Sequence, residues 1–435
     1  MRAITVLTAA MTAVLVAGVT TPTGAVEPGE VRWENRIAEQ AWQTSAGDVA
    51  VSADGTKAYA VGGFQASAQD GSDAFVHAVD VATGATLWTT TLDQDLSVGD
   101  VAVDPTTGQI LTGGTRWKDG KNHAVVTAFS PTGEQVWTSA VPGRVFFGMA
   151  VDAATGQVCV VSATGTGSTW TTQCWSRSGQ VAFSQDYRSR SNSWPDEIVI
   201  DDVTHRIFVA GARTRKFKGL VTTLAYNARG RTLWQRSTRV SENYPYVQGL
   251  AVDPKARRLY LLVDEERRAL VIGQRTTNGR TAFTRILGSG RAKTPRPKFI
   301  DVLPRSHRVV VTSHSKPRYR GTLRYLDERG RQVATAGFHE CCDLTEPVVD
   351  LATDRISIAW GPGSFDDGEP TEDDGVGAAT WDSRGNKVTD LEISSSGQVR
   401  AVAAIASAGE DLLVLGDRPF SNTGGPRGSF LVAVR

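Results

Sequence analysis

Short apolar runs separated by turn residues recur along the chain. The clearest segment runs from Gly99 to Val141 and contains GDVAVDPTTGQILTGG followed by HAVVTAFSPTGEQVWTSAV. An apolar strand ends in Asp or a turn residue, a short turn leads to a second strand, a variable loop leads to a third, and a Gly-containing turn leads to a fourth strand with an aromatic residue. Related copies begin at Gly148 and Gly249. Because no helical periodicity of apolar residues is sustained, the pattern predicts short strands throughout.

The spacing of the copies predicts the fold. Each copy has one apolar anchor in its first strand, and the anchors are Val51, Val103, Val151, Ile200, Val252, Val302, Val349 and Ile405. Successive anchors lie 47 to 56 residues apart. Eight copies of four short strands at this spacing are typical of an all-β, eight-bladed β-propeller of antiparallel blades. The 44 Gly and only 3 Met residues suit many tight turns and few helices.

The fourth strands and the two chain ends predict how the ring is held and closed. The fourth strands of the first five copies carry Trp88, Trp137, Phe183, Trp234 and Phe283. We interpret these aromatic residues as wedges between neighbouring blades. The sixth and seventh copies have Ala334 and Thr389 instead, and the eighth ends after a third strand, SFLVAVR. The segment Val31–Ile37, with Trp33 at the aromatic position, is therefore expected to complete the last blade.

The first 25 residues resemble a secretory signal rather than part of the fold. Arg2 precedes an uncharged run from Ala3 to Val19, and Thr23-Gly24-Ala25 supplies small residues for cleavage. We expect a signal peptide at 1–25, a single propeller domain at 26–435 and a secreted protein without a transmembrane segment. Export permits disulfides. Cys159 and Cys174 fall on the expected second and third strands of the third copy, so we predict a cross-strand disulfide.

The fourth-strand motif Gly-x-x-x-Trp, at Gly84–Trp88, Gly133–Trp137 and Gly230–Trp234, resembles the repeat of pyrroloquinoline-quinone-type propellers. The chain is also similar to the propeller repeats of secreted bacterial proteins. Both resemblances imply the fold across nearly all of the mature chain. They imply no particular activity, because both repeat families include members without enzyme chemistry.

The adjacent pair Cys341-Cys342, followed by Asp343, resembles the vicinal disulfide that lies under the cofactor of quinone-dependent alcohol dehydrogenases. The resemblance implies a cofactor-binding role for both cysteines. It ends there, because Leu344-Thr345-Glu346 stands where that family has Asn-Arg-Gly, and the family's calcium ligands and catalytic Asp have no counterpart motif here. The alternatives are a structural vicinal disulfide or two loop thiols.

An acidic loop between Gly363 and Gly377 is a candidate calcium site. Its candidate ligands are Asp366, Asp367, Asp373 and Asp374, although their spacing is not that of an EF-hand. A solvated loop is the alternative. Asp104, Asp152, Asp201 and Asp253 recur at the ends of first strands, and this recurrence favours turn geometry over catalysis.

The formal net charge of +1 is the sum of a strongly basic stretch and a strongly acidic remainder. From His205 to Thr335 the chain has 29 Lys and Arg against 8 Asp and Glu, whereas the remainder has 18 against 38. Blades four to six should therefore form a basic sector that attracts anions. The candidate anion-binding residues, expected in loops between second and third strands, are Arg213, Arg215, Lys216, Lys218, Lys316, Arg318 and Arg320. Mutual neutralisation of the two sectors is the alternative.

These patterns favour an exported, non-catalytic binding scaffold whose basic sector engages an anionic envelope polymer or an acidic protein surface. No nucleic-acid recognition motif and no catalytic, P-loop or metal motif is present. No cofactor is expected for a scaffold, apart from the calcium considered above. A quinone-dependent oxidoreductase and a polysaccharide lyase or hydrolase acting in the central channel are the alternatives.

Overall fold

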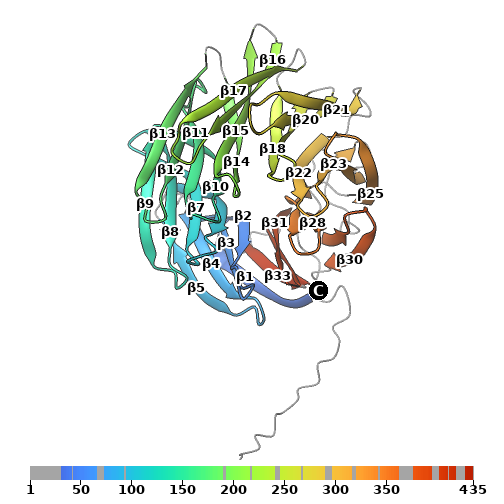
Figure 1. Cartoon of the computed structure of the whole chain (residues 1–435). Coiled ribbons are helices and arrows are strands. Elements are labelled where there is room, and N and C mark those ends of the chain that lie inside the picture. The colour runs from blue at the N-terminus through green and yellow to red at the C-terminus, as the bar shows by residue number, and fades with distance from the viewer. Residues whose placement is uncertain are drawn as a thin grey trace, which may run out of the picture.

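The computed structural model describes residues 31–41, 43–65, 73–92, 95–189, 193–215, 218–240, 245–265, 268–289, 296–315, 320–340, 343–361, 376–393, 401–409, 411–417 and 427–434. In these ranges the chain forms strands and turns and no helix. No element within them is therefore a helix suited to crossing a membrane. The strands form eight separate antiparallel sheets arranged around a ring (Figure 1), which confirms the predicted eight-bladed β-propeller.

The first four blades follow one another along the chain. Blade 1 contains β2 (Gln43–Val51), β3 (Lys57–Gln65), β4 (Asp73–Asp80) and β5 (Thr86–Thr91). Blade 2 contains β6 (Leu96–Val103), β7 (Ile110–Lys118), β8 (Lys121–Phe129) and β9 (Gln135–Pro142). Blade 3 contains β10 (Val145–Val151), β11 (Val158–Ala163), β12 (Thr169–Trp175) and β13 (Val181–Arg188). Blade 4 contains β14 (Ser193–Asp201), β15 (Arg206–Arg215), β16 (Lys218–Tyr226) and β17 (Thr232–Arg239).

Blades 5 to 8 follow the same pattern with two exceptions. The first strand of blade 7 is interrupted, and the fourth strand of blade 8 comes from the N-terminal segment. Blade 5 contains β18 (Tyr246–Asp253), β19 (Arg258–Glu265), β20 (Arg268–Arg275) and β21 (Thr281–Ser289). Blade 6 contains β22 (Arg296–Leu303), β23 (Arg308–Ser315), β24 (Arg320–Leu326) and β25 (Gln332–Glu340). Blade 7 has a first strand split into β26 (Asp343–Leu344) and β27 (Val348–Asp350), then β28 (Arg355–Gly361), β29 (Val376–Trp381) and β30 (Lys387–Ile393). Blade 8 contains β31 (Ala401–Ala408), β32 (Asp411–Asp417), β33 (Arg427–Val434) and β1 (Val31–Ala41).

The N-terminal strand closes the ring, as the sequence predicted. Strand β1 pairs antiparallel with β33, and Trp33 lies opposite Ala433. In Figure 1 the blue strand β1 and the red strand β33 lie side by side in this blade. The indole Nε1 of Trp33 donates a hydrogen bond of 2.8 Å to the carbonyl of Val81 in blade 1. The last blade is therefore tied both to the chain start and to the first blade.

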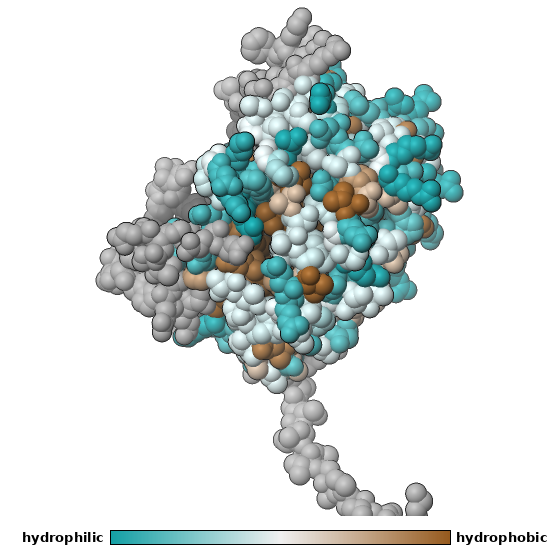
Figure 2. All heavy atoms as spheres, turned by 90° about the vertical axis from the view of Figure 1, so that its left-hand side faces the viewer, coloured by the Kyte–Doolittle hydropathy of each residue, from teal (hydrophilic) through white to brown (hydrophobic). Residues whose placement is uncertain are grey.

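The apolar core lies between the blades rather than within one centre. Eight clusters of buried residues occupy the eight seams, one for each pair of adjacent blades. Each sheet buries both faces in this way, which a single blade could not do alone. The side of blades 2 and 3 in Figure 2 is mostly teal and white with separate brown patches. Val136 and Val181 are among the exposed apolar residues of these two blades.

The predicted aromatic wedges are confirmed, and each one meets a glycine of the next blade. A Cβ added to Gly133 would lie 2.7 Å from the Trp88 ring, and a Cβ added to Gly230 would lie 2.4 Å from Phe183. Both glycines have a positive φ, which a side chain would strain. In blades 1 to 6, the turn between the third and fourth strands therefore fits directly against the outer-strand aromatic residue of the preceding blade.

The recurring aspartates at the ends of first strands shape turns, as expected. The Asp152 carboxylate accepts hydrogen bonds from the backbone N–H groups of Ala154 and Thr155. Some of these aspartates also join neighbouring blades, because Arg177 of blade 3 pairs with Asp104 of blade 2. His205 likewise contacts Asp152 of the preceding blade at 2.7 Å. These aspartates therefore stabilise turns and join neighbouring blades, and both roles are structural.

Candidate functional site

The inner wall of the ring is built from irregular first strands. In blades 1 to 6 and in blade 8, the pairing of the first strand with the second shifts register once, for example between Val98 and Asp100 and between Pro195 and Glu197. In blade 7 the strand is interrupted at Thr345-Glu346-Pro347. Such bulges bend a strand and re-aim its side chains. Here they bring residues near the middle of the first strands to the channel.

The central channel contains a cavity of about 620 Å³ in which carboxylates from five blades converge. They are Asp48, Asp100, Glu197, Asp301 and Glu346. Apolar residues such as Phe147, Ile300 and Ile405 form the rest of the wall. No Lys, Arg or His is among the described residues that line the cavity. The channel is therefore an acidic chamber with apolar walls.

Several of these acids tie neighbouring first strands together. Asp48 accepts a hydrogen bond of 3.1 Å from the backbone N–H of Val101 in blade 2. Asp100 does the same, at 3.0 Å, for the N–H of Met149 in blade 3. Asp196, beside Glu197, accepts the N–H of Val247 in blade 5 at 3.1 Å. These three carboxylates thus fix the spacing of the blades, and Asp48 and Asp100 also contribute to the charge of the channel.

Confinement changes the protonation of the channel acids. Burial raises the pKa of Asp48 and of Asp301 to about 6. Burial, followed by repulsion from Asp48, raises the pKa of Asp100 to about 7. The Glu346 side chain is exposed to the channel, but protein surrounds the channel and keeps bulk water away. This burial, followed by repulsion from Asp48, Asp301 and Asp100, raises the pKa of Glu346 to about 8.

The pKa of Glu197 is also raised. Burial first, and then repulsion from Glu346, Asp196 and Asp100, raises its pKa well above the ordinary value. The acids therefore share one electrostatic environment across the channel, and the pKa values of four of them are spread from about 6 to about 8. A cation entering the channel would relieve their mutual repulsion, whereas an anion would add to it.

The channel does not form a compact metal site in the described part of the chain. Among these residues, no group of three or more His, Cys, Asp or Glu side chains is arranged to hold a metal ion. The acids come from blades on different sides of the ring, and three of them already accept backbone hydrogen bonds. The arrangement is better suited to an extended or amine-bearing cation than to a small coordinated ion.

The basic residues singled out in the sequence lie partly on strands. Arg213 and Arg215 belong to β15, Lys218 to β16 and Arg320 to β24, so the expectation of loop positions was wrong for these four. The strands extend further than expected because antiparallel pairing continues to the turn, where Arg215 lies opposite Lys218. Arg213 is half-buried and donates a hydrogen bond to Ser237 of its own blade. Lys216, Lys316 and Arg318 lie outside the described residues.

Other basic residues of blades 4 to 6 gather on the opposite face of the ring. Antiparallel strands alternate in direction, so the turns between first and second strands and between third and fourth strands share one face. Nine exposed basic residues lie at these turns in the three blades. Arg305 donates to the carbonyl of Ala352 and Arg331 pairs with Asp327. The other seven are here called the hairpin-face patch. They are Arg229, Arg231, Lys255, Arg257, Arg275, Arg280 and Arg329. The charge count in the sequence predicted a basic sector, but it did not predict the face on which these residues lie.

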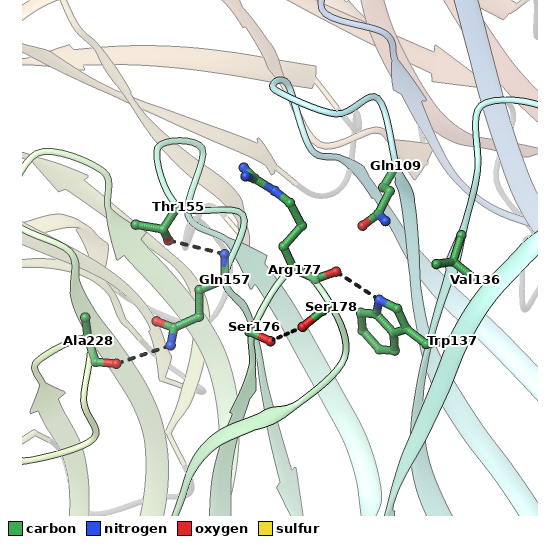
Figure 3. A pocket seen from close by; sticks show the side chains of 9 residues that line it. All are labelled: Gln109, Val136, Trp137, Thr155, Gln157, Ser176, Arg177, Ser178 and Ala228. Carbon is green, nitrogen blue, oxygen red and sulfur yellow. Dashed lines mark hydrogen bonds between the residues drawn. The ribbon is translucent and has the colours of Figure 1, made fainter.

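A second hollow, on the same face, lies at the seams of blades 2, 3 and 4. Its volume is about 610 Å³, and Figure 3 shows Trp137, Arg177 and Gln157 around it. Trp137 donates to the carbonyl of Arg177 at 3.1 Å, and Gln157 donates to the carbonyl of Ala228 at 3.2 Å. The Arg177 guanidinium is held by Asp104. Trp137, Gln157 and Arg177 therefore use their polar groups to join neighbouring blades, so we interpret the hollow as a structural gap between blades rather than a binding site.

The cysteine predictions have different outcomes. Cys159 and Cys174 lie directly opposite each other on β11 and β12, with Cα atoms 4.0 Å apart, and form the predicted disulfide. Cys341 and Cys342 lie outside the described residues, as do the candidate calcium ligands Asp366, Asp367, Asp373 and Asp374.

The described channel residues do not fit a quinone cofactor. Pyrroloquinoline quinone carries several carboxylate groups, which require basic or metal partners. The lining supplies five carboxylates, including Glu197 and Glu346, and none of its residues is basic. The carboxylates of the channel would thus repel the carboxylates of the quinone.

The acidic channel was missed at the sequence level although a signal was present. Asp48, Asp100, Glu197 and Glu346 each lie three residues before the anchor of their copy. An acid at the same place in four copies could have been found by aligning the repeats on these anchors. Asp301, only one residue before Val302, has no such signature. Which side of the strand these positions face depends on the bulges.

Comparisons with known proteins support the fold and nothing more specific. No family model matches the chain, and no curated protein sequence matches it. Among solved structures, it is similar to the Dos1 propeller, with a TM-score of 0.59, 9% identity and coverage of 92% of this chain and 94% of that one. The C-terminal WD40 domain of Sif2 gives a TM-score of 0.57 at 12% identity, covering 94% of this chain and 100% of that domain.

An enzyme also contains a similar structure. Prolyl oligopeptidase B from Galerina marginata, a mutant bound to a 35mer hydrolysis and macrocyclization substrate, gives a TM-score of 0.51 at 8% identity. The match covers 91% of this chain but 55% of the peptidase. At such low identities the likeness shows a shared β-propeller architecture alone. The propeller part of the resemblance noted in the sequence is thereby confirmed, and its closer likeness to quinone-type repeats stays a prediction.

Proposed function

We propose that this protein is an exported, non-catalytic binding propeller whose basic sector, in blades 4 to 6, engages an anionic polymer of the cell envelope. The observation that carries the proposal is the exposure of many basic side chains in this sector with few acids beside them. An acidic protein surface is the alternative partner. A focused positive field concentrates polyanions, and rigid blades hold the charges in fixed positions.

Export is supported by the sequence of residues 1–25 and by the Cys159–Cys174 disulfide. Disulfides persist in oxidising compartments and are rare in the cytosol. We expect the mature protein to begin at Val26. Mass spectrometry of the protein recovered outside the cytoplasm tests this expectation, and an uncut chain retained in the cytoplasm would contradict it.

The binding proposal is tested with purified mature protein. We expect retention on immobilised poly(glycerol phosphate) or polygalacturonate, and no retention on a neutral dextran matrix. Because each neutralised charge releases a counterion, the affinity should fall steeply with salt. Absence of binding at low ionic strength, or binding that salt does not weaken, would refute the proposal.

The acidic channel favours a second candidate function, the binding of a cationic ligand. Its carboxylates come from five blades without any basic lining residue among those described. We expect a bis-quaternary ammonium such as hexamethonium, whose charge does not change with pH, to bind more tightly at pH 9 than at pH 5, because the channel acids with pKa values of about 6 to 8 ionise in this interval. In calorimetry, E197Q combined with E346Q should weaken binding at least about tenfold. D390N, which removes an exposed acid of β30, is the control and should leave binding unchanged.

A further inference from the structure

The hairpin-face patch lies at turns of the same kind in three consecutive blades, and one position of these turns carries an arginine in each of them. The turn between the third and fourth strands contains a glycine of positive φ, namely Gly230, Gly279 and Gly330 in blades 4, 5 and 6. The residue after this glycine is Arg231, Arg280 or Arg331 in these blades. At the same position, blades 1, 2, 3 and 7 have Ala85, Glu134, Gln180 and Asn386. Repetition in adjacent blades places the arginines along one arc of the ring.

The seven patch residues are free to meet a ligand. None of them forms a side-chain hydrogen bond or ion pair with another described residue. Neighbouring arginines are different, because Arg206 donates to the carbonyl of Thr276, Arg308 to the carbonyl of Ser383, and Arg331 pairs with Asp327. The structural arginines and the free ones are therefore distinct sets on the same face.

The turns that carry the patch are held firmly. In blade 4, Asn227 accepts the backbone N–H groups of Arg229 and Arg231 at 3.1 and 2.9 Å. In blade 5, Asn278 accepts the N–H of Arg280 at 3.0 Å. Gly230 also contacts the aromatic residue of the preceding blade, as described above. The guanidinium groups thus extend from fixed backbone positions, which lowers the entropy lost when several bind at once.

The chemistry of the patch points to a linear polyanion. Guanidinium groups form paired, charge-assisted hydrogen bonds with phosphate and carboxylate groups. A protein interface would be expected to supply buried aromatic or large apolar anchors. At the described turns of blades 4 to 6 on this face, the large apolar side chain most exposed is Val203, at 72%. Charge without an aromatic anchor suits a flexible polymer with repeated phosphate or carboxylate groups.

We propose that the hairpin face of blades 4 to 6, rather than the opposite loop face, is the surface that binds a linear polymer of repeated phosphate or carboxylate groups. The inference rests on the proposed function and specifies where that function resides. The polymer would lie across three neighbouring hairpins and contact at least one arginine in each. This arrangement predicts that binding strengthens with polymer length until the arc is spanned.

The experiment compares two variants that lose the same charge in the same sector. The hairpin variant is R229Q/R280Q/R329Q, one substitution in each blade. The loop variant is R215Q/K218Q/R320Q, with substitutions at the end of β15 and at the starts of β16 and β24, on the opposite face. Affinity for poly(glycerol phosphate) and for polygalacturonate is measured at several salt concentrations, which distinguishes a phosphate from a carboxylate source. Circular dichroism and thermal melting verify that both variants are folded.

We expect the hairpin variant to lose at least about tenfold in affinity and to show a shallower salt dependence, since fewer charges are neutralised. The loop variant should stay within about twofold of the wild type. R229K/R280K/R329K should recover the salt dependence but only part of the affinity, because ammonium groups cannot form the paired hydrogen bonds.

Three outcomes separate the inference from the function on which it rests. If the loop variant loses binding and the hairpin variant keeps it, the inference is overturned and the proposed function stands. Equal losses in both variants would also overturn it, since the sector would then act through its net charge alone. If the wild type binds neither polymer, the proposed function itself fails. Should the triple variant unfold, R280Q alone is measured, with an expected loss of about threefold.

Discussion

The channel and the hairpin-face patch show two ways in which one ring holds charge. The channel acids lie on inner strands, confined among apolar walls and one another, and their pKa values are raised by burial. The patch residues lie at the turns of the same kind of blade, exposed to solvent and free of partners among the described residues. Blades of the same architecture thus bury acidic side chains on their inner strands and expose basic side chains at their turns.

Distance from bulk water decides what a charge does in this fold. In the channel, ionisation costs free energy, so the carboxylates couple the folded state to pH. On the hairpin face, solvent screens the arginines, so they contribute little to stability and stay available for binding. The following substitutions test this division, beginning with the scaffold beneath the arginines.

The largest effect is expected from Gly230→Ala. Its Cβ would lie 2.4 Å from the Phe183 ring, and its φ of 79° is strained for any side chain. We expect a loss of about 2–4 kcal/mol in the free energy of unfolding, measured with urea. The matched control is Gly120→Ala, because Gly120 also has a positive φ, 72°, but nothing lies within 4 Å of its added Cβ.

That control should lose only about 1 kcal/mol, the cost of the backbone conformation alone. The difference between the two variants then measures the contact between hairpin and aromatic residue. Similar losses in both would mean that the hairpin is not held against the preceding blade, and the fixed positions assigned to the patch arginines would be unsupported.

A smaller, pH-dependent effect is expected from Glu346→Gln. Its pKa is about 8 in the folded protein and the ordinary value is 4.5, so the folded state binds more protons between these values. Its contribution to stability is therefore greatest below pH 4.5 and is lost as the pH rises through about 8. Removing the charge should raise the melting temperature at pH 9 by a few degrees and change it little at pH 5.

The control for this experiment is D390N, because Asp390 is exposed on β30 and pairs only with the nearby Lys387 among the described residues. Its melting temperature should show no such gain at pH 9. A gain of the same size in D390N would indicate a general effect of net charge, and the contrast between confined and exposed acids would be lost.

The smallest effect on stability is expected from the hairpin variant R229Q/R280Q/R329Q. Since these side chains have no partner among the described residues, we expect its melting temperature to stay within about 1 °C of the wild type at every pH. Differential scanning calorimetry checks this. A loss of several degrees would show that the arginines support the fold, and their assignment to binding would have to be revised.

Much of the fold could be predicted from the repeats, because each copy carries its own turn and anchor residues. The anchors from Val51 to Ile405 marked eight blades, Trp33 identified the closing strand, and the spacing of Cys159 and Cys174 indicated their disulfide. The candidate site was predicted less well. Its acids are ordinary strand residues in the sequence, and the extent of β15 and β16 was underestimated around Arg213 and Lys218.

Local sequence determined the strands, the turns and the number of blades, because these depend on contacts between residues close together in the chain. It also determined that one stretch of the chain is basic. Only the tertiary structure decided that Asp48 and Glu346, almost three hundred residues apart, face one chamber. It likewise decided which arginines are used between blades and which are free. Convergence of distant strands and alternation of strand direction are properties of the closed ring, so no single repeat contains them.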